Sequence, residues 1–421
     1  MANNFDSNFT RKLAKVFLDK FESERVLSKN VNTQLLSGKF GSDTGDTVDF
    51  KRPTDYTSKR TSAGDISGGT RDSIITGKAS GTVQDYFTVD VDFDEADEAL
   101  KMDQLDSLLA PMATRIKTDL ELDFGEFCLK NTALLSGAVG TGVTTWDHVA
   151  GAGAIMQASG VPMDQDWCYF ANPFTQRSLA SNQRSLGGET GSMSANQRAV
   201  ITDNFAGMKV MTATTLPSYT TGVGADRAGT LSGTPTATYL AAKDTMTMSI
   251  AVTAFQANLV VAAGETITVT GRNRLNLSTR KPIVDETGAQ ILFSGTVTAA
   301  VTLNGSGAGT LVITGPGVYE AAGAFNTVDS ALTSGDVVTL GGAASTLIQP
   351  NLFWHKQAFG IGSVPIKKLY STDTIATTED GLQFRVSKYA NGDANKQIVR
   401  FDFRPAYAVL NPFFAGKSFG G

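Results

Sequence analysis

The sequence predicts an α+β protein of several domains, in which an all-β domain is inserted into a mixed host domain. Residues 111–131 carry apolar side chains every three or four positions, as a long amphipathic helix does. Residues 87–93 and 382–404 alternate apolar and polar side chains, as half-buried strands do. Residues 222–346 are rich in Thr, Ala, Val and Gly, whereas the sequence on both sides is mixed. A chain of 421 residues also exceeds one ordinary domain.

The N-terminal segment predicts an isolated amphipathic helix. Phe9, Leu13 and Phe17 recur at four-residue spacing within residues 7–27, so they share one face of a helix. Nothing helical follows until about residue 94. We therefore expect residues 1–36 to form an arm that lies on another surface.

A long polar segment follows the arm. Between Ser37 and Ile75 the chain is dense in Gly, Ser, Thr and Asp and has no hydrophobic periodicity. A loop of this length inside a compact domain is either disordered or functional. Because an alternating strand at residues 87–93 follows, we expect residues 37–93 to form an extended two-stranded loop.

Residues 94–221 predict a long helix and then a mixed α+β layer. The helix is indicated by apolar residues at helical spacing: Leu108, Met112, Ile116, Leu120, Phe124 and Phe127. Because proline suits the first turn of a helix, we expect the main helix to begin at Pro111, after a separate lead-in, and to end near Asn131. Further helices are expected at 146–159 and 173–179, and strands at 168–171 and 209–212.

Residues 222–346 predict a separate all-β domain. Short alternating runs with frequent glycine turns are typical of a sandwich or barrel of about immunoglobulin size. Residues 347–421 return to a mixed composition and contain a hairpin formed by 382–387 and 399–404. Since mixed sequence flanks the β segment on both sides, we expect an insertion into a host domain.

Composition and charge argue against several classes of function. Lys and Arg total 36 against 41 Asp and Glu, and a net charge of −5 disfavours a sequence-independent grip on nucleic acid as the main activity. No stretch approaches about eighteen consecutive apolar residues, and no signal peptide is evident, so we expect neither membrane insertion nor export. Cys128 and Cys168 are expected to be buried and unpaired.

No catalytic, metal or cofactor site is predicted. His148 and His355 are the only histidines, and neither has a Cys or another His at metal-ligand spacing. The glycine clusters at 137–142 and 305–309 lack the Gly-Lys-Ser/Thr ending of a phosphate-binding loop. We therefore expect a protein that acts through its surfaces and is not an enzyme.

Several short motifs occur in a fixed order along the chain. They are Phe50-Lys51-Arg52-Pro53, Gly64-Asp65-Ile66-Ser67-Gly68, Gly77-Lys78-Ala79-Ser80-Gly81, Leu109-Ala110-Pro111, Thr118-Asp119-Leu120-Glu121, the segment 388–395, Arg400-Phe401-Asp402 and Pro405-Ala406-Tyr407. Together with the order of arm, loop, helix and inserted β domain, they resemble the major capsid (coat) proteins of short-tailed enterobacterial DNA phages. The resemblance covers essentially the full length.

The resemblance implies the tailed-phage major capsid fold, of the Hong Kong ninety-seven type, with an inserted immunoglobulin-like domain. In that fold residues 94–221 correspond to a peripheral domain with a spine helix and the start of an axial domain, to which 347–421 return. The implied function is structural: self-assembly, with a scaffolding protein, into an icosahedral shell around double-stranded DNA. The implied partners are other copies in hexamers and pentamers, the scaffold, the portal and non-specifically contacted DNA, with no membrane. The implied location is the virion, after assembly in the host cytoplasm.

Contacts between copies are expected from three sets of residues. Charges that would be surplus on a single subunit are expected to form ion pairs across the seam between two subunits. The candidates in the loop are Lys51, Arg52, Lys59, Arg60, Asp65, Asp72 and Lys78. The candidates in the arm are Phe9, Leu13 and Phe17. The candidates in the inserted domain are Arg272, Arg274, Arg280 and Lys281.

Two other classes of function remain as alternatives. A β-rich surface adhesin or carbohydrate-binding protein would have a secretion signal and an aromatic patch in the β domain, and the sequence has few aromatic residues there. An enzyme would have a perturbed carboxylate or cysteine in a deep pocket.

Overall fold

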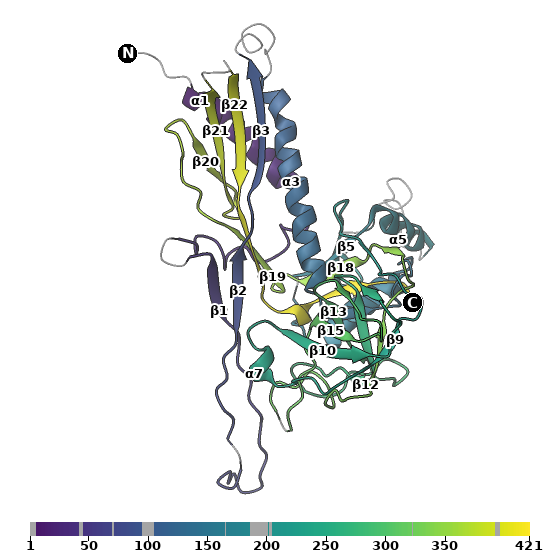
Figure 1. Ribbon diagram of the computed structural model, residues 1–421. Helices are drawn as coiled ribbons and strands as arrows, with labels where there is room; N and C mark the ends of the chain where they lie inside the picture. The colour runs from purple at the N-terminus through teal and green to yellow at the C-terminus, as the bar shows by residue number, and fades with distance from the viewer. Residues whose placement is uncertain are drawn as a thin grey trace. The chain divides into compact units, whose positions relative to one another are not determined.

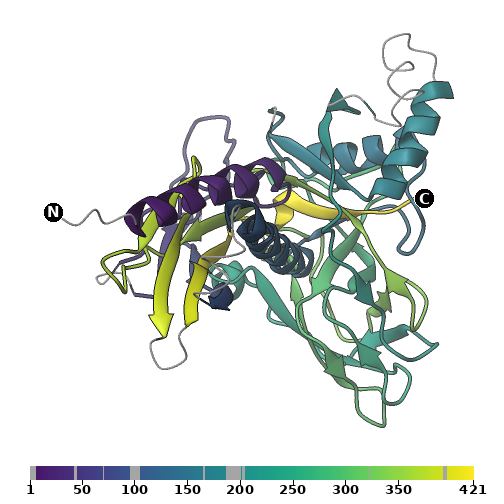
Figure 2. The ribbon, with the colours of Figure 1, turned by 90° about the horizontal axis from the view of Figure 1, so that it is seen from above.

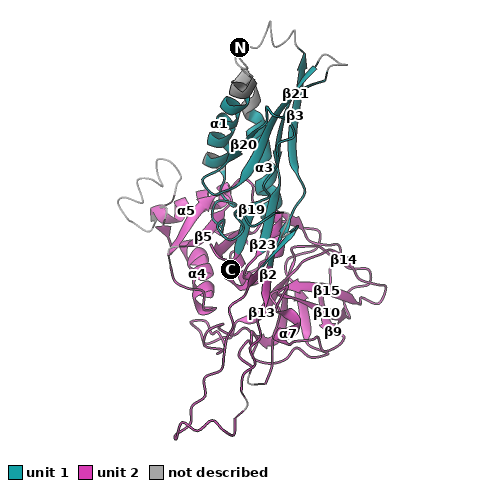
Figure 3. Ribbon diagram, turned by 90° about the vertical axis from the view of Figure 1, so that its left-hand side faces the viewer, with its two compact units in different colours: residues 1–49, 80–125, 359–408 teal, residues 50–79, 126–358, 409–421 magenta. Residues whose placement is uncertain are grey.

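The computed structural model describes residues 6–41, 45–69, 71–94, 105–164, 166–185, 201, 204–321, 323–391 and 396–421. The side chains of residues 6–9, 23, 24, 105–110 and 185 lie outside this description. The chain forms two compact units, coloured in Figure 3. Unit 1 comprises Met1–Asp49, Ser80–Gly125 and Phe359–Ala408, and unit 2 comprises Phe50–Ala79, Glu126–Ala358 and Val409–Gly421. Each unit combines helices and strands from distant parts of the sequence, which confirms the predicted α+β class.

Unit 1 contains a four-stranded antiparallel sheet covered by a helix. Its strand order is β20 (Thr374–Thr377), β21 (Gln383–Asn391), β22 (Lys396–Phe403) and β3 (Phe87–Asp94). The predicted hairpin is confirmed as β21 and β22, with Phe384 opposite Phe403. Figure 2 shows α1 (Asp6–Glu24) lying across one face of this sheet.

A second four-stranded sheet has the order β1 (Thr47–Lys51), β2 (Lys78–Val83), β23 (Pro405–Val409) and β19 (Phe359–Ser363). Because β1 and β2 are neighbours, the chain leaves along one and returns along the other, as expected of a two-stranded excursion. The alternating strand at 87–93 does not belong to this excursion, since it joins the other sheet as β3.

The long helix α3 spans Leu105–Lys130 without interruption. The prediction that it begins at Pro111 is therefore wrong. Proline removes one N–H donor and crowds the carbonyl four residues earlier, so it disfavours a helix interior without forbidding it. The apolar face after the proline is fully buried at Met112, Ile116, Leu120 and Phe124, and this burial stabilises the helix on both sides of Pro111.

The host part of unit 2 is a six-stranded sheet. Its order is β4 (Leu134–Ser136), β24 (Ala415–Ser418), β18 (Asn351–His355), β5 (Trp167–Ala171), β7 (Met208–Thr212) and β6 (Asn204–Phe205). Both central strands, β18 and β5, are buried at every position. The helices are α4 (Trp146–Ala158) and α5 (Pro173–Ser185), and the short elements are β8 (Tyr219–Thr220), β17 (Leu347–Ile348) and the 3-10 turn η1 (Pro412–Phe414). The helices and strands predicted here are confirmed, although α5 extends beyond residue 179.

Six of the strands between residues 228 and 340 form a closed barrel, and Figure 1 labels five of them. Its order is β10 (Thr247–Thr253), β15 (Gly309–Thr314), β13 (Leu292–Val297), β12 (Thr266–Asn273), β16 (Val337–Leu340) and β9 (Ala228–Leu231). Because β9 pairs with both β16 and β10, the strands enclose one apolar core and do not form the two separate sheets of an immunoglobulin domain. The short elements β11 (Val260–Val261), β14 (Val301–Thr302) and α7 (Tyr239–Ala242) complete the domain.

Candidate functional site

The long loop, defined here as residues 52–77 between β1 and β2, carries five of the seven charged contact residues predicted for this part of the chain. Its two limbs run side by side away from the strands (Figure 1). Thr57 on one limb donates its backbone N–H to Asp72 on the other at 2.7 Å and its hydroxyl at 2.8 Å. These hydrogen bonds, that of the hydroxyl first, lower the pKa of Asp72. Asp72 therefore ties the limbs together within one chain.

Four other charged candidates lie on the surface of this region. Lys51, Lys59, Arg60 and Asp65 are all exposed. The backbone N–H of Ser67 donates to Asp65 at 2.9 Å, and this bond lowers the pKa of Asp65. All four side chains are thus accessible to another molecule, which is what a seam contact requires.

The loop also exposes large apolar side chains. Tyr56, Ile66 and Ile74 are 53%, 48% and 77% exposed. Single exposed apolar residues are ordinary, but several on one polar segment are typical of a surface that binds protein. In a protein–protein interface, charged side chains are typical of the rim and large apolar side chains are typical of the buried centre. The loop offers both kinds.

Arg52 is not a surface charge. It is 7% exposed, and its guanidinium donates to the carbonyl of Lys78 at 3.0 Å, to that of Val409 at 3.2 Å and to that of Leu410. Burial lowers its pKa to about 10. The prediction that Arg52 pairs across a seam is therefore wrong, because three carbonyl groups of its own chain occupy its donors. The carbonyl of Lys78 is part of this contact, whereas the Lys78 side chain is exposed.

Arg280 also binds within its own chain. Its guanidinium donates to a carboxylate oxygen of Asp55 at 2.6 Å and to the carbonyl of Asn326 at 2.8 Å. The expectation that Arg280 contacts a neighbour is thus corrected, since its partner is the base of the long loop. Lys281 is exposed and remains a candidate.

The two other candidate arginines of the inserted domain also bind within their own chain. Arg272 makes two hydrogen bonds to Asp336, at 2.7 and 2.6 Å. Arg274 is 3% exposed and donates to the carbonyls of Ala133 at 2.9 Å and Ser294 at 2.6 Å. Burial lowers the pKa of Arg274 to about 10. The prediction of an intersubunit role is wrong for Arg274, because the side chain is buried and its acceptors belong to its own chain. For Arg272, which is half-buried, it stays a prediction.

The N-terminal helix does not extend away as an arm. Leu13 and Phe17 are each 1% exposed. The ring of Phe17 stacks on Phe401 with centroids 4.8 Å apart and tilts against Phe384 at 4.6 Å. The apolar face thus covers the sheet of its own unit, and these side chains are unavailable to a neighbour. Phe9 belongs to α1, but its side chain lies outside the described residues.

Glu121 of α3 holds the segment that follows α1, a role that sequence reasoning missed. It is 1% exposed and accepts hydrogen bonds from the backbone N–H groups of Leu27 at 2.7 Å and Ser28 at 3.0 Å. A buried carboxylate needs such donors. Helical spacing puts Glu121 outside the row of apolar residues that includes Ile116 and Leu120, which concealed this contact.

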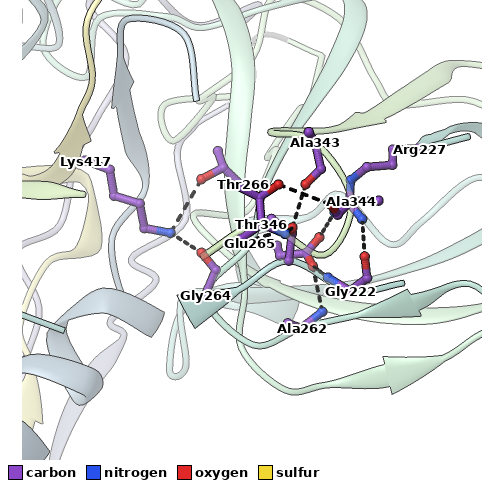
Figure 4. A network of polar contacts seen from close by, with 11 residues as sticks. Gly222, Arg227, Ala262, Gly264, Glu265, Thr266, Ala343, Ala344, Thr346 and Lys417 are labelled. Atoms are coloured by element: carbon purple, nitrogen blue, oxygen red, sulfur yellow. Dashed lines mark hydrogen bonds and ion pairs between the residues drawn. The ribbon is translucent and has the colours of Figure 1, made fainter. Parts of the chain in front are cut away.

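A buried polar network lies where the chain enters the barrel (Figure 4). Glu265 is fully buried and pairs with Arg227. Its carboxylate also accepts hydrogen bonds from the backbone N–H groups of Gly222 at 2.6 Å and Ala262 at 3.0 Å. Loss of one partner would leave an uncompensated buried charge, so the network holds the entering segment in one position.

Lys417 of β24 reaches the same junction from the host sheet (Figure 4). Its ammonium group donates to the carbonyl of Gly264 at 2.6 Å and to the hydroxyl of Thr296 at 3.1 Å. Burial lowers its pKa to about 7. Sequence reasoning missed this residue, although a single lysine between Phe414 and Phe419 in an otherwise uncharged segment was a usable signal.

One group of metal-type ligands was found among the described residues: Asp164, Asp166 and His355. His355 Nε2 lies 3.0 Å from both carboxylate oxygens of Asp164, while its Nδ1 accepts the backbone N–H of Gln357 at 3.1 Å. The proton of the neutral ring is therefore on Nε2, the atom that would face a metal ion. This arrangement suits a hydrogen bond and does not fit a metal ligand.

Two further expectations from the sequence are that the cysteines are buried and that the chain does not insert into a membrane. Cys128 and Cys168 are buried thiols outside any disulfide, as predicted, and burial raises the pKa of the Cys168 thiol to about 11. A thiol with a raised pKa is a poor nucleophile. Among the described residues, no helix combines the length and the apolar character that a membrane span requires.

Comparisons with known proteins agree along the whole chain. Residues 1–421 match the family described as "P22 coat protein - gene protein 5". The chain is 35% identical over 424 residues to the major capsid protein of Acyrthosiphon pisum secondary endosymbiont phage 1, with 100% of both chains covered.

Two solved structures are also similar. The chain titled "Mycobacterium phage Che8" has a TM-score of 0.49 at 12% identity, covering 94% of this chain and 90% of that chain. The chain titled "Capsid structure of the Cyanophage P-SCSP1u" has a TM-score of 0.44 at 11% identity, covering 90% and 84%.

Proposed function

Because this chain belongs to the P22 coat protein family over its full length and is the major capsid protein of a phage, we propose that its copies assemble with a scaffolding protein into an icosahedral shell around double-stranded DNA. The single observation that carries the proposal is the family match over residues 1–421. Copies in this shell form hexamers and pentamers. The protein acts through its surfaces, with no enzymatic activity and no cofactor. The adhesin alternative has no observation in its favour.

The parts of the chain have separate roles in this proposal. The helix-covered sheet of unit 1 and α3 serve as the peripheral domain, the six-stranded sheet serves as the axial domain, and residues 222–346 serve as the inserted domain. The long loop reaches a neighbouring copy. Its exposed charges and its exposed Tyr56, Ile66 and Ile74 support that role.

The proposed partners beyond other copies are the scaffolding protein, the portal and the packaged DNA. A net charge of −5 supports only non-specific contact with DNA, since a strongly basic wall would hold the genome by releasing its counterions. The place of the protein is the virion, and assembly takes place in the host cytoplasm.

The proposal is tested by electron microscopy and light scattering of the purified full chain, alone and mixed with the scaffolding protein of the same phage. We expect light scattering to rise steeply above a threshold concentration, and micrographs to show closed polyhedral shells in at least one condition. A chain that stays monomeric at high concentration in both conditions would contradict the proposal.

A further inference from the structure

The base of the long loop is attached to the barrel at three points, which together we call the loop clasp: Asp55 with Arg280, Lys78 with Asp244, and Ile75 with the cluster around Tyr239. All of these residues belong to unit 2. None of the three contacts involves the exposed part of the loop that carries Lys59, Arg60, Asp65 and Ile66. They are therefore separate from the surface that is proposed to meet a neighbour.

The first contact holds the outgoing limb. Arg280 donates to Asp55 at 2.6 Å, and the same guanidinium is anchored to the barrel by the carbonyl of Asn326 at 2.8 Å. The backbone of Arg280 has φ of +54°, a conformation that few residues other than glycine adopt. This strained position points to a backbone that the surrounding contacts hold in place.

The second contact holds the returning limb. The backbone N–H of Lys78 donates to the Asp244 carboxylate at 3.1 Å, and the backbone N–H of Arg52 bonds the carbonyl of Gly77 at 2.8 Å. A Cβ atom at Gly77 would lie 2.4 Å from the carbonyl oxygen of Lys243. The limb thus lies so close to the barrel that only glycine fits.

The third contact is apolar. Tyr239, Ala242 and Val318 form a small buried cluster against which Ile75 packs. The ring of Tyr239 stacks on Phe325 with centroids 3.8 Å apart, which extends the cluster. Ion pairs near a surface contribute little by themselves, so this apolar contact gives the clasp much of its stability.

We propose that the inserted barrel is the positioning element of the long loop: it holds both limbs at their base and so sets the direction in which the loop reaches a neighbouring copy. This inference rests on the proposed function, because direction matters only if the loop meets another subunit. A small change of angle at the base becomes a large displacement at the tip of a long loop. Asp55, Asp244 and Arg280 are thus positioning residues for shell geometry, acting through the exposed part of the loop.

The first test compares Gly77→Ala with Gly305→Ala in the full chain. The second variant is the matched control, because Gly305 is an exposed glycine of the same unit outside the loop and a Cβ there has no atom within 4 Å. In the unassembled chain, we expect the amides of Arg52 and Lys78 to exchange hydrogen about tenfold faster in Gly77→Ala than in the control. We expect shells of one diameter from the unaltered chain and the control, and mixed diameters or open sheets from Gly77→Ala. Uniform normal shells from Gly77→Ala would overturn the inference, whether or not its amides exchange faster.

The second test exchanges the two charges of the Asp55–Arg280 contact. It tests the positioning role of the barrel even if Gly77→Ala does not fold. Asp55→Arg and Arg280→Asp should each widen the distribution of shell diameters, and the double variant should restore it. Lys356→Asp, which reverses an exposed cation of the same unit that takes no part in the clasp, is the control for charge reversal alone. Rescue by the double variant separates positioning from a general loss of stability, and failure of rescue would overturn the inference. Failure of the unaltered chain to form shells would instead overturn the proposed function.

Discussion

Lys417 and Arg274 are buried cations whose hydrogen-bond partners are neutral carbonyl and hydroxyl oxygens. Moving a cation out of water has a large free-energy cost, which hydrogen bonds to neutral groups offset only in part. Burial accordingly lowers both pKa values, to about 7 for Lys417 and about 10 for Arg274. Of these two residues, only Lys417 changes its charge near neutral pH.

This difference predicts how the stability of the chain depends on pH. Lys417 has a pKa of about 7 when folded and its ordinary value of 10.5 when unfolded. Between these values the unfolded chain binds more protons, so the free energy of unfolding rises with pH by on the order of a few kcal/mol. Below pH 7 both states are protonated and the slope from Lys417 vanishes. In the Lys417→Met variant, the free energy of unfolding should no longer rise with pH through this group. Urea unfolding at a series of pH values from about 6 to about 10 measures the difference.

The control for this experiment is Lys281→Met, which removes an exposed lysine of the same unit. It should keep the pH dependence of the unaltered chain. An unchanged slope in Lys417→Met would show that the buried amine does not titrate as argued.

At the scale of elements, α1 is held to its sheet by a few aromatic side chains. Phe17 contacts Phe384 and Phe401, and Phe21 contacts Phe384 and Phe403. These contacts make α1 part of the core of unit 1.

Truncation of one ring tests that packing. Phe17→Ala should lower the free energy of unfolding by about 3–5 kcal/mol, because it leaves a cavity between helix and sheet. Lys12→Ala, on the exposed side of the same helix, should change it by less than about 0.5 kcal/mol. Chemical denaturation of the unassembled chain measures both. Equal stability of the two variants would mean that α1 is not part of the core.

Sequence patterns predicted most elements because helix and strand periodicities are local properties. They did not predict which surface an element meets: the spacing of Leu13 and Phe17 identified an apolar face, but the strands that Phe17 contacts, β21 and β22, lie more than 350 residues later in the chain. The contact residues were harder still. Arg52 and Arg274 appeared to be surface charges because the carbonyl groups that accept their hydrogen bonds come together only in the folded chain.

At the scale of the whole molecule, exposed loop charges link the single chain to the proposed shell. Reversing two of them with Lys59→Glu and Arg60→Glu should leave folding unchanged and strongly reduce shell formation, because like charges would then meet across the seam. Raising the salt concentration should weaken assembly of the unaltered chain by screening the same contacts. Light scattering against concentration, at low salt and at about 1 M salt, measures both effects.

A charge-matched control places the same reversal elsewhere. Arg11→Glu with Lys12→Glu changes the net charge equally on an exposed part of α1. If both double variants assemble equally badly, net charge and not the loop decides the outcome. If both assemble as well as the unaltered chain, the loop charges take no part in assembly.

The edge strands of an open sheet carry unpaired backbone N–H and C=O groups, and these groups can pair with the edge strand of another molecule. In the closed barrel each of the six strands is paired on both sides, so the barrel sheet itself has no such edge. When many copies are crowded into one particle, each exposed edge strand would become a starting point for fibres or disordered aggregates. A closed barrel can therefore be carried in every copy, and changes on its outer face do not open a sheet edge that would compete with the contacts that order the lattice.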